Sequence, residues 1–164
     1  MSIEIVIEFN CIFIPFKSID MSVSDRLKAL KEEKSAANLI AAENFLSENA
    51  TKHGVVVLAS GLQYQILVEG QGEKPQLHNI VTCHYHGTLI SGEVFDSSVK
   101  RGQPASFPVN GVIKGWIEAL QLMPVGSKWR LFLHPALAYG DRQVSATIGP
   151  NCALVFDVEL LSFR

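Results

Sequence analysis

The sequence predicts an α+β fold, in which a curled antiparallel sheet wraps around one short helix and an amphipathic helix precedes the sheet. Two observations carry this prediction. Four runs between residues 62 and 160 alternate apolar and polar side chains, as strands with one buried face do. A single segment, residues 113–120, spaces its apolar side chains at i, i+3, i+4 and i+7, as a helix with one buried face does.

The overall composition fits one globular domain with an appendage. Of the 164 residues, 48% are hydrophobic and 18% are charged, which supports a packed core and argues against disorder. A formal charge of −2 gives no reason to expect nucleic acid, and no apolar stretch is long enough to span a bilayer. We therefore expect neither nucleic acid nor a membrane among the partners.

Residues 1–20 form a leader of uncertain status. They are apolar and β-branched, but Glu4 and Glu8 interrupt them, and neither a positive start nor a small-residue cleavage site is clear. The leader is either an extra strand or an extension upstream of Met21, and both interpretations stay open. The chain has an odd number of cysteines and no Cys-x-x-Cys pair, which favours a reducing compartment. The unclear export signal by itself predicts a cytoplasmic location.

Residues 21–58 are typical of an amphipathic helix followed by a linker. The helix is expected from Ser24, as N-cap, to about Lys52, with Asp25 at the positive end of the dipole and Gly54 as a natural stop. Its apolar stripe is expected to contain Leu27, Leu30, Ala37, Ala41 and Phe45. An isolated helix of this length is only marginally stable in water, so the stripe needs a partner. Docking on the domain, self-association and client binding all stay open.

The later strands follow from period-two alternation. Leu62, Tyr64, Ile66 and Val68 share one face of the first run, and residues 80–89 form the second run, closed by a turn at Ser91-Gly92. Trp129, Leu131 and Leu133 alternate with Lys128, Arg130 and Phe132 in the third run, and Leu154, Phe156, Val158 and Leu160 share a face of the last run. We expect these apolar faces to form one buried side of the sheet.

The single helix between these strands begins at Val112 and Ile113 and stops before Pro124. Its apolar face includes Ile113, Trp116, Ile117 and Leu120. Such a face must be buried, and the inner face of the sheet is the only large surface available. A pocket between helix and sheet would be lined by the side chains that both elements point inward.

Aromatic side chains recur at spacings suited to such a pocket, with almost no candidate nucleophile or base among them. The segments that carry them are Tyr85 in its strand, Phe95-Asp96-Ser97-Ser98, Phe107, Val112-Ile113-Lys114-Gly115-Trp116, Ala138-Tyr139-Gly140 and Leu154-Val155-Phe156-Asp157-Val158. In this order they resemble the FKBP-type peptidyl-prolyl cis–trans isomerases, over residues 61–164. Residues 108–116 and 123–129 resemble most the bacterial macrophage-infectivity-potentiator branch.

The resemblance implies an FKBP-type isomerase domain over residues 59–164, acting on X-Pro bonds in peptides and unfolded chains and open to macrolide inhibitors. It implies catalytic roles for Asp96, Tyr139 and the backbone N–H of Ile113. It implies substrate-binding roles for Tyr85, Phe95, Phe107, Val112, Trp116, Ile148 and Phe156. Neither a metal nor an organic cofactor is expected. The alternative from another class is a non-catalytic chaperone or binding module that uses the N-terminal helix, alone or as a homodimer.

The chemistry of proline isomerisation suits such a pocket. Resonance gives the peptide C–N bond a rotational barrier of about 18–20 kcal/mol, and X-Pro bonds exchange over tens of seconds or longer. Because the planar amide is more dipolar than the twisted one, a dry cavity that disfavours the planar form lowers this barrier. A donor or dipole suited to the twisted form adds to the effect. No nucleophile is needed.

Three features test the limits of the resemblance. His84 and His86 share the strand face opposite Tyr85, but no third metal ligand is evident. Ala105 stands where many family members have an aromatic side chain, so that wall is expected to be more open. The loop 141–150 lacks the usual internal glycine, and Gly149 replaces a common proline. These departures bear on substrate preference and macrolide affinity more than on activity.

Overall fold

The computed structural model describes residues 22–164, so the alternatives left open for the leader lie outside the described residues. The helices are α1 (Val23–Asn49), α2 (Ser98–Arg101) and α3 (Lys114–Leu122), with 3-10 turns at Val109–Gly111 and Pro135–Leu137. The strands are β1 (Val55–Val57), β2 (Gln63–Val68), β3 (Ile80–Leu89), β4 (Val94–Ser97), β5 (Ala105–Pro108), β6 (Lys128–Leu133) and β7 (Leu154–Phe163).

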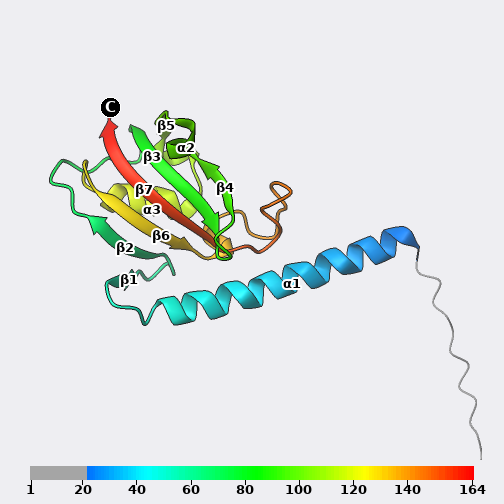
Figure 1. Ribbon diagram of the computed structural model, residues 1–164. Coiled ribbons are helices and arrows are strands. Elements are labelled where there is room, and N and C mark those ends of the chain that lie inside the picture. Colours follow the sequence, from blue (N-terminus) through cyan, green and yellow to red (C-terminus); the bar gives the residue numbers. More distant parts are fainter. Residues whose placement is uncertain (1–21) are drawn as a thin grey trace, which may run out of the picture.

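All seven strands form one antiparallel sheet in the order β1-β2-β6-β7-β3-β4, with β5 paired to β3 beside β4. Figure 1 shows the sheet curling around α3, with α1 outside it, so the predicted α+β architecture is confirmed. The longest pairing joins β3 to β7 and aligns Tyr85 with Val158. β1 and β5 are additional strands of three and four residues, too short for alternation to reveal them in the sequence.

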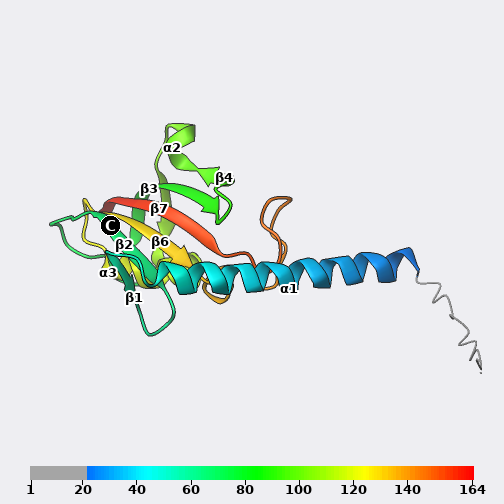
Figure 2. The ribbon, with the colours of Figure 1, turned by 60° about the horizontal axis from the view of Figure 1, so that its bottom comes forward.

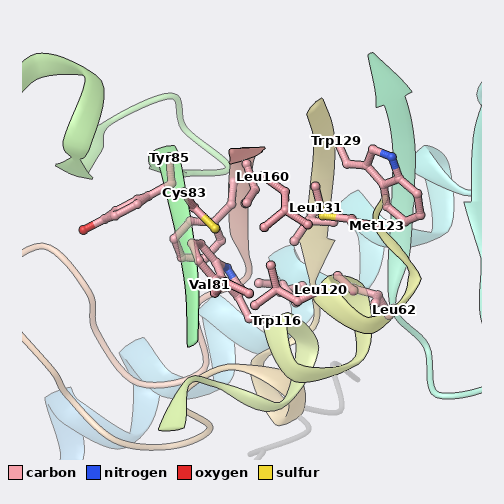
Figure 3. Close-up of a cluster of buried hydrophobic side chains, with 14 of the residues drawn as sticks. Leu62, Val81, Cys83, Tyr85, Trp116, Leu120, Met123, Trp129, Leu131 and Leu160 are labelled. Atoms are coloured by element: carbon pink, nitrogen blue, oxygen red, sulfur yellow. The ribbon is translucent and has the colours of Figure 1, made fainter. Parts of the chain in front are cut away.

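Helix α3 fills the concave side of the sheet. Trp116, Ala119 and Leu120 are buried there, and Figure 3 shows Trp116 and Leu120 facing the side chains of the strands. A Cβ on Gly115 would lie 1.9 Å from Leu133 Cδ2, so only glycine lets α3 approach β6 this closely. The helix begins at Lys114, later than predicted, because Ile113 is an extended N-cap with φ −64° and ψ 151°.

Strand β2 departs from the predicted inward face. Leu62, just before the strand, is buried, but Ile66 and Val68 are about half exposed, and polar Gln63 is buried instead. β1 pairs only with residues 63–65, and the register with β6 shifts between Ile66 and Val68. The far end of β2 therefore has an uncovered edge, whereas Gln63 is buried because α1 lies against it and satisfies its amide.

The N-cap of helix α1 lies two residues before the predicted one. Ser22 is the cap: its Oγ accepts from the Asp25 backbone N–H at 3.2 Å and donates to the Asp25 carboxylate at 2.8 Å. This reciprocal pair closes the first turn around Ser24, which lies inside the helix. The helix ends at Asn49, and the left-handed Gly54 (φ +81°) turns the chain into β1.

The predicted apolar stripe of α1 is also wrong. Leu27, Leu30, Ala37 and Ala41 are exposed, and only Phe45 of that set is half-buried. The face that meets the domain contains Ser35, Asn38, Ala42, Leu46 and Asn49, which we call the α1 seam. Its polar members bond to partners in the domain and its apolar members are buried, so hydrogen bonding and burial together define the docked face. Apolar spacing alone could not identify it.

The far end of the seam covers the outer face of the sheet. Phe45 lies 6.1 Å from Phe132, ring centroid to ring centroid, so Phe132 is buried although it points away from α3. Asn49 donates to Gln63 Oε1 at 2.9 Å, and Gln63 donates to the Leu46 carbonyl at 2.8 Å. Figure 2 shows the other end of α1 extending beyond the domain. No helix of residues 22–164 has both the length and the apolarity to cross a membrane.

Candidate active site

A cavity of about 630 Å³ opens between α3, the strands around β3 and the loop that follows Tyr139. All ten site residues inferred from the resemblance contribute to its lining. They are Tyr85, Phe95, Asp96, Phe107, Val112, Ile113, Trp116, Tyr139, Ile148 and Phe156. Gly111, Val144 and Ser145 complete the lining. The structure therefore brings together one carboxylate and two phenols within an otherwise largely apolar wall.

Trp116 forms the floor of this cavity and is itself only 3% exposed. Tyr85, Phe107 and Phe156 meet its indole edge to face, with ring centroids 5.5, 6.0 and 5.3 Å away. This arrangement suits the quadrupoles of the rings and fixes the orientation of the indole. Among the described residues, Trp116 Nε1 is the one buried side-chain nitrogen or oxygen without a hydrogen-bond partner.

The opposite wall depends on a glycine in β3. Phe95 and Phe156 meet edge to face at 5.4 Å, and both rings lie over Gly87. A Cβ on Gly87 would approach the Phe95 ring to 2.7 Å and the Phe156 ring to 2.9 Å, so a larger residue would displace one of them. Ala105 does not line the cavity, and Phe107 supplies the aromatic ring on the β5 side.

Asp96 belongs to a hydrogen-bonded cluster at the rim. The Tyr85 hydroxyl donates to Asp96 Oδ2 at 2.5 Å, as the resemblance implies, and Figure 3 shows this hydroxyl pointing away from the core. Arg101 pairs with the same carboxylate and donates to Tyr85 Oη at 2.8 Å. Burial alone would raise the pKa of Asp96, but hydrogen bonds from Tyr85 and Arg101 outweigh it and hold the pKa below its usual value. The carboxylate therefore stays charged at neutral pH.

Arg101 is a site residue that the sequence analysis does not contain. Ser97 caps the short α2 by accepting from the Lys100 N–H, and the left-handed Gly102 ends it, so Arg101 is turned back toward Asp96. A guanidinium can bond an anion and a phenol at once, which suits this position. The feature of the sequence that could have identified Arg101 is its position, five residues after a carboxylate that lies at an apolar wall.

Two donors face the cavity without an acceptor among residues 22–164. One is the Tyr139 hydroxyl; burial, together with the nearby negative charge of Asp96, raises the pKa of this phenol, so it keeps its proton. The other is the backbone N–H of Ile113, the N-cap of α3. The Ile113 carbonyl accepts from the N–H groups of Trp116 and Ile117, but the Ile113 N–H precedes the helix and has no acceptor in it. Both suit a substrate carbonyl.

The loop after Tyr139 closes one side of the cavity. Its residues Val144 and Ser145 were not predicted as lining, whereas Ile148 was and is 6% exposed. The Ser145 hydroxyl accepts from the N–H groups of Thr147 and Ile148 at 3.2 and 2.9 Å, so it stabilises the loop. Among residues 22–164 this hydroxyl has no hydrogen bond to a base that could make it a nucleophile. Nothing in the sequence marked these exposed loop residues.

The two outward histidines serve the neighbouring turn. His84 Nδ1 lies 3.1 Å from Ser98 Oγ, and His86 Nδ1 lies 3.0 Å from Ser97 Oγ. Within residues 22–164 no group of three or more possible metal ligands occurs.

Burial raises the pKa of the Cys83 thiol to about 12, so this core cysteine keeps its proton at neutral pH.

Comparison with known proteins identifies the same two parts of the chain. Residues 71–161 match the model of the FKBP-type peptidyl-prolyl cis–trans isomerase family, and residues 16–66 match that of the domain amino terminal to it. The chain is 51% identical over 139 residues to an FKBP-type 22 kDa peptidyl-prolyl cis–trans isomerase of Escherichia coli strain K12, covering 85% of this chain and 68% of the relative.

Two further proteins extend the comparison. An outer membrane protein MIP of Legionella longbeachae is 52% identical over 132 residues, which cover 80% of this chain but only 57% of the relative. The crystal structure of FkpA from Escherichia coli superimposes with a TM-score of 0.79 at 36% identity, covering 88% of this chain and 74% of that one. On these grounds the chain belongs to the family of FKBP-type peptidyl-prolyl cis–trans isomerases.

Proposed function

We propose that this isomerase accelerates rotation about X-Pro bonds by binding the prolyl segment in the cavity over Trp116 and favouring the twisted amide. The observation that carries the proposal is the cavity lining itself: six aromatic residues form much of its wall, and Asp96 and Tyr139 lie at the same hollow. Because water solvates the planar, more dipolar amide best, a dry cavity raises its free energy relative to the twisted amide.

Each polar group has a proposed part in the reaction. The Tyr139 hydroxyl donates to the carbonyl that precedes the proline, since it has no other acceptor among the described residues. The Ile113 N–H holds a second substrate carbonyl. Asp96, kept charged by Tyr85 and Arg101, presents a fixed dipole to the rotating amide. Each ~1.4 kcal/mol by which these contacts prefer the twisted form gives about tenfold in rate.

Substrates are X-Pro peptides and folding chains with an apolar X, because the wall beside the proline position is apolar. The aromatic Phe95 and Phe156 and the aliphatic Ile148 supply that wall, and Val144 extends it toward solvent. A macrolide that presents an apolar ring and two carbonyls competes for the same space. Its affinity depends on the altered loop 141–150.

A direct assay tests this proposal. Tetrapeptides that differ only at X are isomerised by the wild type, and kcat/KM is measured with and without a macrolide such as rapamycin. We expect Leu and Phe at X to exceed Glu by at least tenfold, and the macrolide to abolish the difference. Equal rates for Leu and Glu would contradict the apolar wall as the source of specificity.

A second use of the chain, as a binding module through α1, is favoured by one observation. Val23, Leu27 and Leu30 lie at i, i+4 and i+7 on the projecting end of α1, and all three are more than 60% exposed. An apolar stripe without a partner among residues 22–164 suits a second copy or an unfolded client. We propose the second copy as its occupant, forming a homodimer along α1, with client binding as the competing outcome.

Light scattering of the full chain distinguishes these occupants. The variant Leu27→Glu/Leu30→Glu should be a monomer where the wild type is a dimer, with short-peptide kcat/KM changed less than twofold. If the wild type is already monomeric, the stripe serves clients, and the variant should then act more slowly on a proline-limited refolding protein. The cytoplasmic location stays a prediction from sequence, and one relative is named an outer membrane protein.

A further inference from the structure

The loop that closes the cavity is joined at its base by one backbone hydrogen bond. The Asn151 N–H donates to the Gly140 carbonyl at 2.8 Å, which brings together the two ends of the loop 141–150. Both residues have left-handed backbones, with φ +60° for Gly140 and +54° for Asn151. Asn151 is the one non-glycine residue with positive φ in residues 22–164. We call Gly140 and residues 149–151 the neck.

Helix α1 holds this neck through two polar side chains of its seam. Asn38 donates from Nδ2 to the Pro150 carbonyl at 2.8 Å, and Asn151 donates from Nδ2 to Ser35 Oγ at 2.9 Å. Gly149 and Pro150 are buried, and a Cβ on Gly149 would lie 3.4 Å from Asn38 Nδ2. In Figures 1 and 2 the base of the orange loop lies beside the middle of α1, while its tip extends away from the helix.

The neck is one residue away from the cavity on both of its sides. Gly140 follows Tyr139 directly, and Gly149 follows Ile148, and both Tyr139 and Ile148 line the cavity. A left-handed backbone at a non-glycine residue costs free energy and persists only when its surroundings fix it. Ser35 fixes Asn151 by bonding its side chain, so the loss of that bond would weaken the Asn151 bond to the Gly140 carbonyl and leave Gly140 held by the bond from its own N–H to the Pro135 carbonyl.

We propose that Ser35 and Asn38 are positioning residues for the isomerisation, acting through the neck to hold Tyr139 and Ile148 at the cavity. The inference rests on the proposed role of Tyr139. It makes α1 part of the catalytic unit, although no residue of α1 lines the cavity. A small displacement of a reacting group is costly, because hydrogen-bond strength falls steeply with misalignment.

The chain offers a matched control on the same helix. Asn44 and Ser47 are an exposed asparagine and serine, three residues apart like Ser35 and Asn38. Ser35→Ala/Asn38→Ala and Asn44→Ala/Ser47→Ala therefore change helix propensity equally, and both keep α1 helical. A third variant, Asn38→Asp, keeps the size of the side chain and removes its donor. A fourth, Ser35→Thr, keeps the hydroxyl acceptor.

The experiment measures kcat and KM on an X-Pro tetrapeptide at 10 °C and amide hydrogen exchange at Asn151, all in the full chain. Ser35→Ala/Asn38→Ala and Asn38→Asp should lower kcat/KM about five- to tenfold, mostly in kcat, and speed exchange at Asn151. Ser35→Thr and the Asn44/Ser47 pair should stay within twofold of wild type.

Two results would overturn the inference. Equal kcat/KM for the neck pair and the control pair, in a wild type that does isomerise the peptide, would reduce these contacts to docking alone. A loss of kcat/KM without faster exchange at Asn151 would mean that Ser35 and Asn38 do not act on the cavity through the neck. A wild type without turnover would instead contradict the proposed function itself.

Discussion

Around the cavity, aromatic rings meet one another with centroids 5.3–6.0 Å apart, whereas along the α1 seam amides and a hydroxyl make the long-range contacts. The cavity wall is built from side chains that alternation or helical spacing marks in the sequence. The seam depends also on its polar members Ser35, Asn38 and Asn49, which no hydrophobic pattern selects. The difference teaches that apolar periodicity predicts a core well, and a polar contact between two elements poorly.

The largest expected effect comes from removing the indole on which the aromatic cavity wall packs. Trp116→Ala should cost about 3–5 kcal/mol of unfolding free energy, because it removes the indole on which three rings pack. Ile40→Ala, at an exposed position of α1 outside both the seam and the proposed dimer stripe, should stay within about 0.5 kcal/mol. Urea denaturation measures both. A cost below about 1 kcal/mol for Trp116→Ala would mean that the aromatic rings of the cavity wall do not need the indole for their packing.

A smaller effect is expected from removing a polar contact of the α1 seam. Asn49→Leu leaves the buried Gln63 Oε1 without its donor and should cost about 1–3 kcal/mol. Asn49→Leu/Gln63→Leu should recover part of this loss, because both polar groups are then gone. The exposed Asn44→Leu is the control and should be nearly neutral. If the double variant is as unstable as the sum of its single variants, the pair is not coupled.

The smallest effect concerns pH. The pKa of Asp96 is lowered in the folded protein, so its charged form contributes stability above the ordinary aspartate pKa of about 3.9, and this is lost as pH falls through the folded pKa. Arg101→Ala removes one of the groups that lower the pKa of Asp96. As pH is lowered, the variant should therefore lose isomerase activity at a higher pH than the wild type does. A carboxyl-carbon NMR titration of Asp96 checks this. An unmoved pKa would contradict the assigned ion pair.

Much of the isomerase domain could be predicted from the sequence. The run of residues 80–89 forms β3 with Tyr85 inward and His84 outward, because strict alternation on a half-buried strand leaves one solution. The spacing of Trp116 and Leu120 likewise fixed the face of α3. The set of site residues came from the resemblance, and the structure brings all ten to one cavity, while their roles stay predictions.

The remaining features depend on contacts distant in sequence. Phe132 sits at an outward position of β6 and is buried only because Phe45 of α1 covers it. Arg101 reaches Asp96 only because α2 is short and ends at a left-handed glycine. The sequence predicts Ser24 as the N-cap where the structure has Ser22, since both serines precede Asp25 closely and apolar spacing does not distinguish them.

The most direct test of the account is the rate of cis–trans exchange in an X-Pro tetrapeptide, measured by NMR exchange spectroscopy for the wild type and for Asp96→Val/Tyr139→Phe. Removing the carboxylate and the free phenolic donor should lower kcat/KM about a hundredfold while the melting temperature stays close to that of the wild type. An unchanged exchange rate in a folded double variant would contradict the claim that these two groups, set in a dry aromatic cavity, favour the twisted amide.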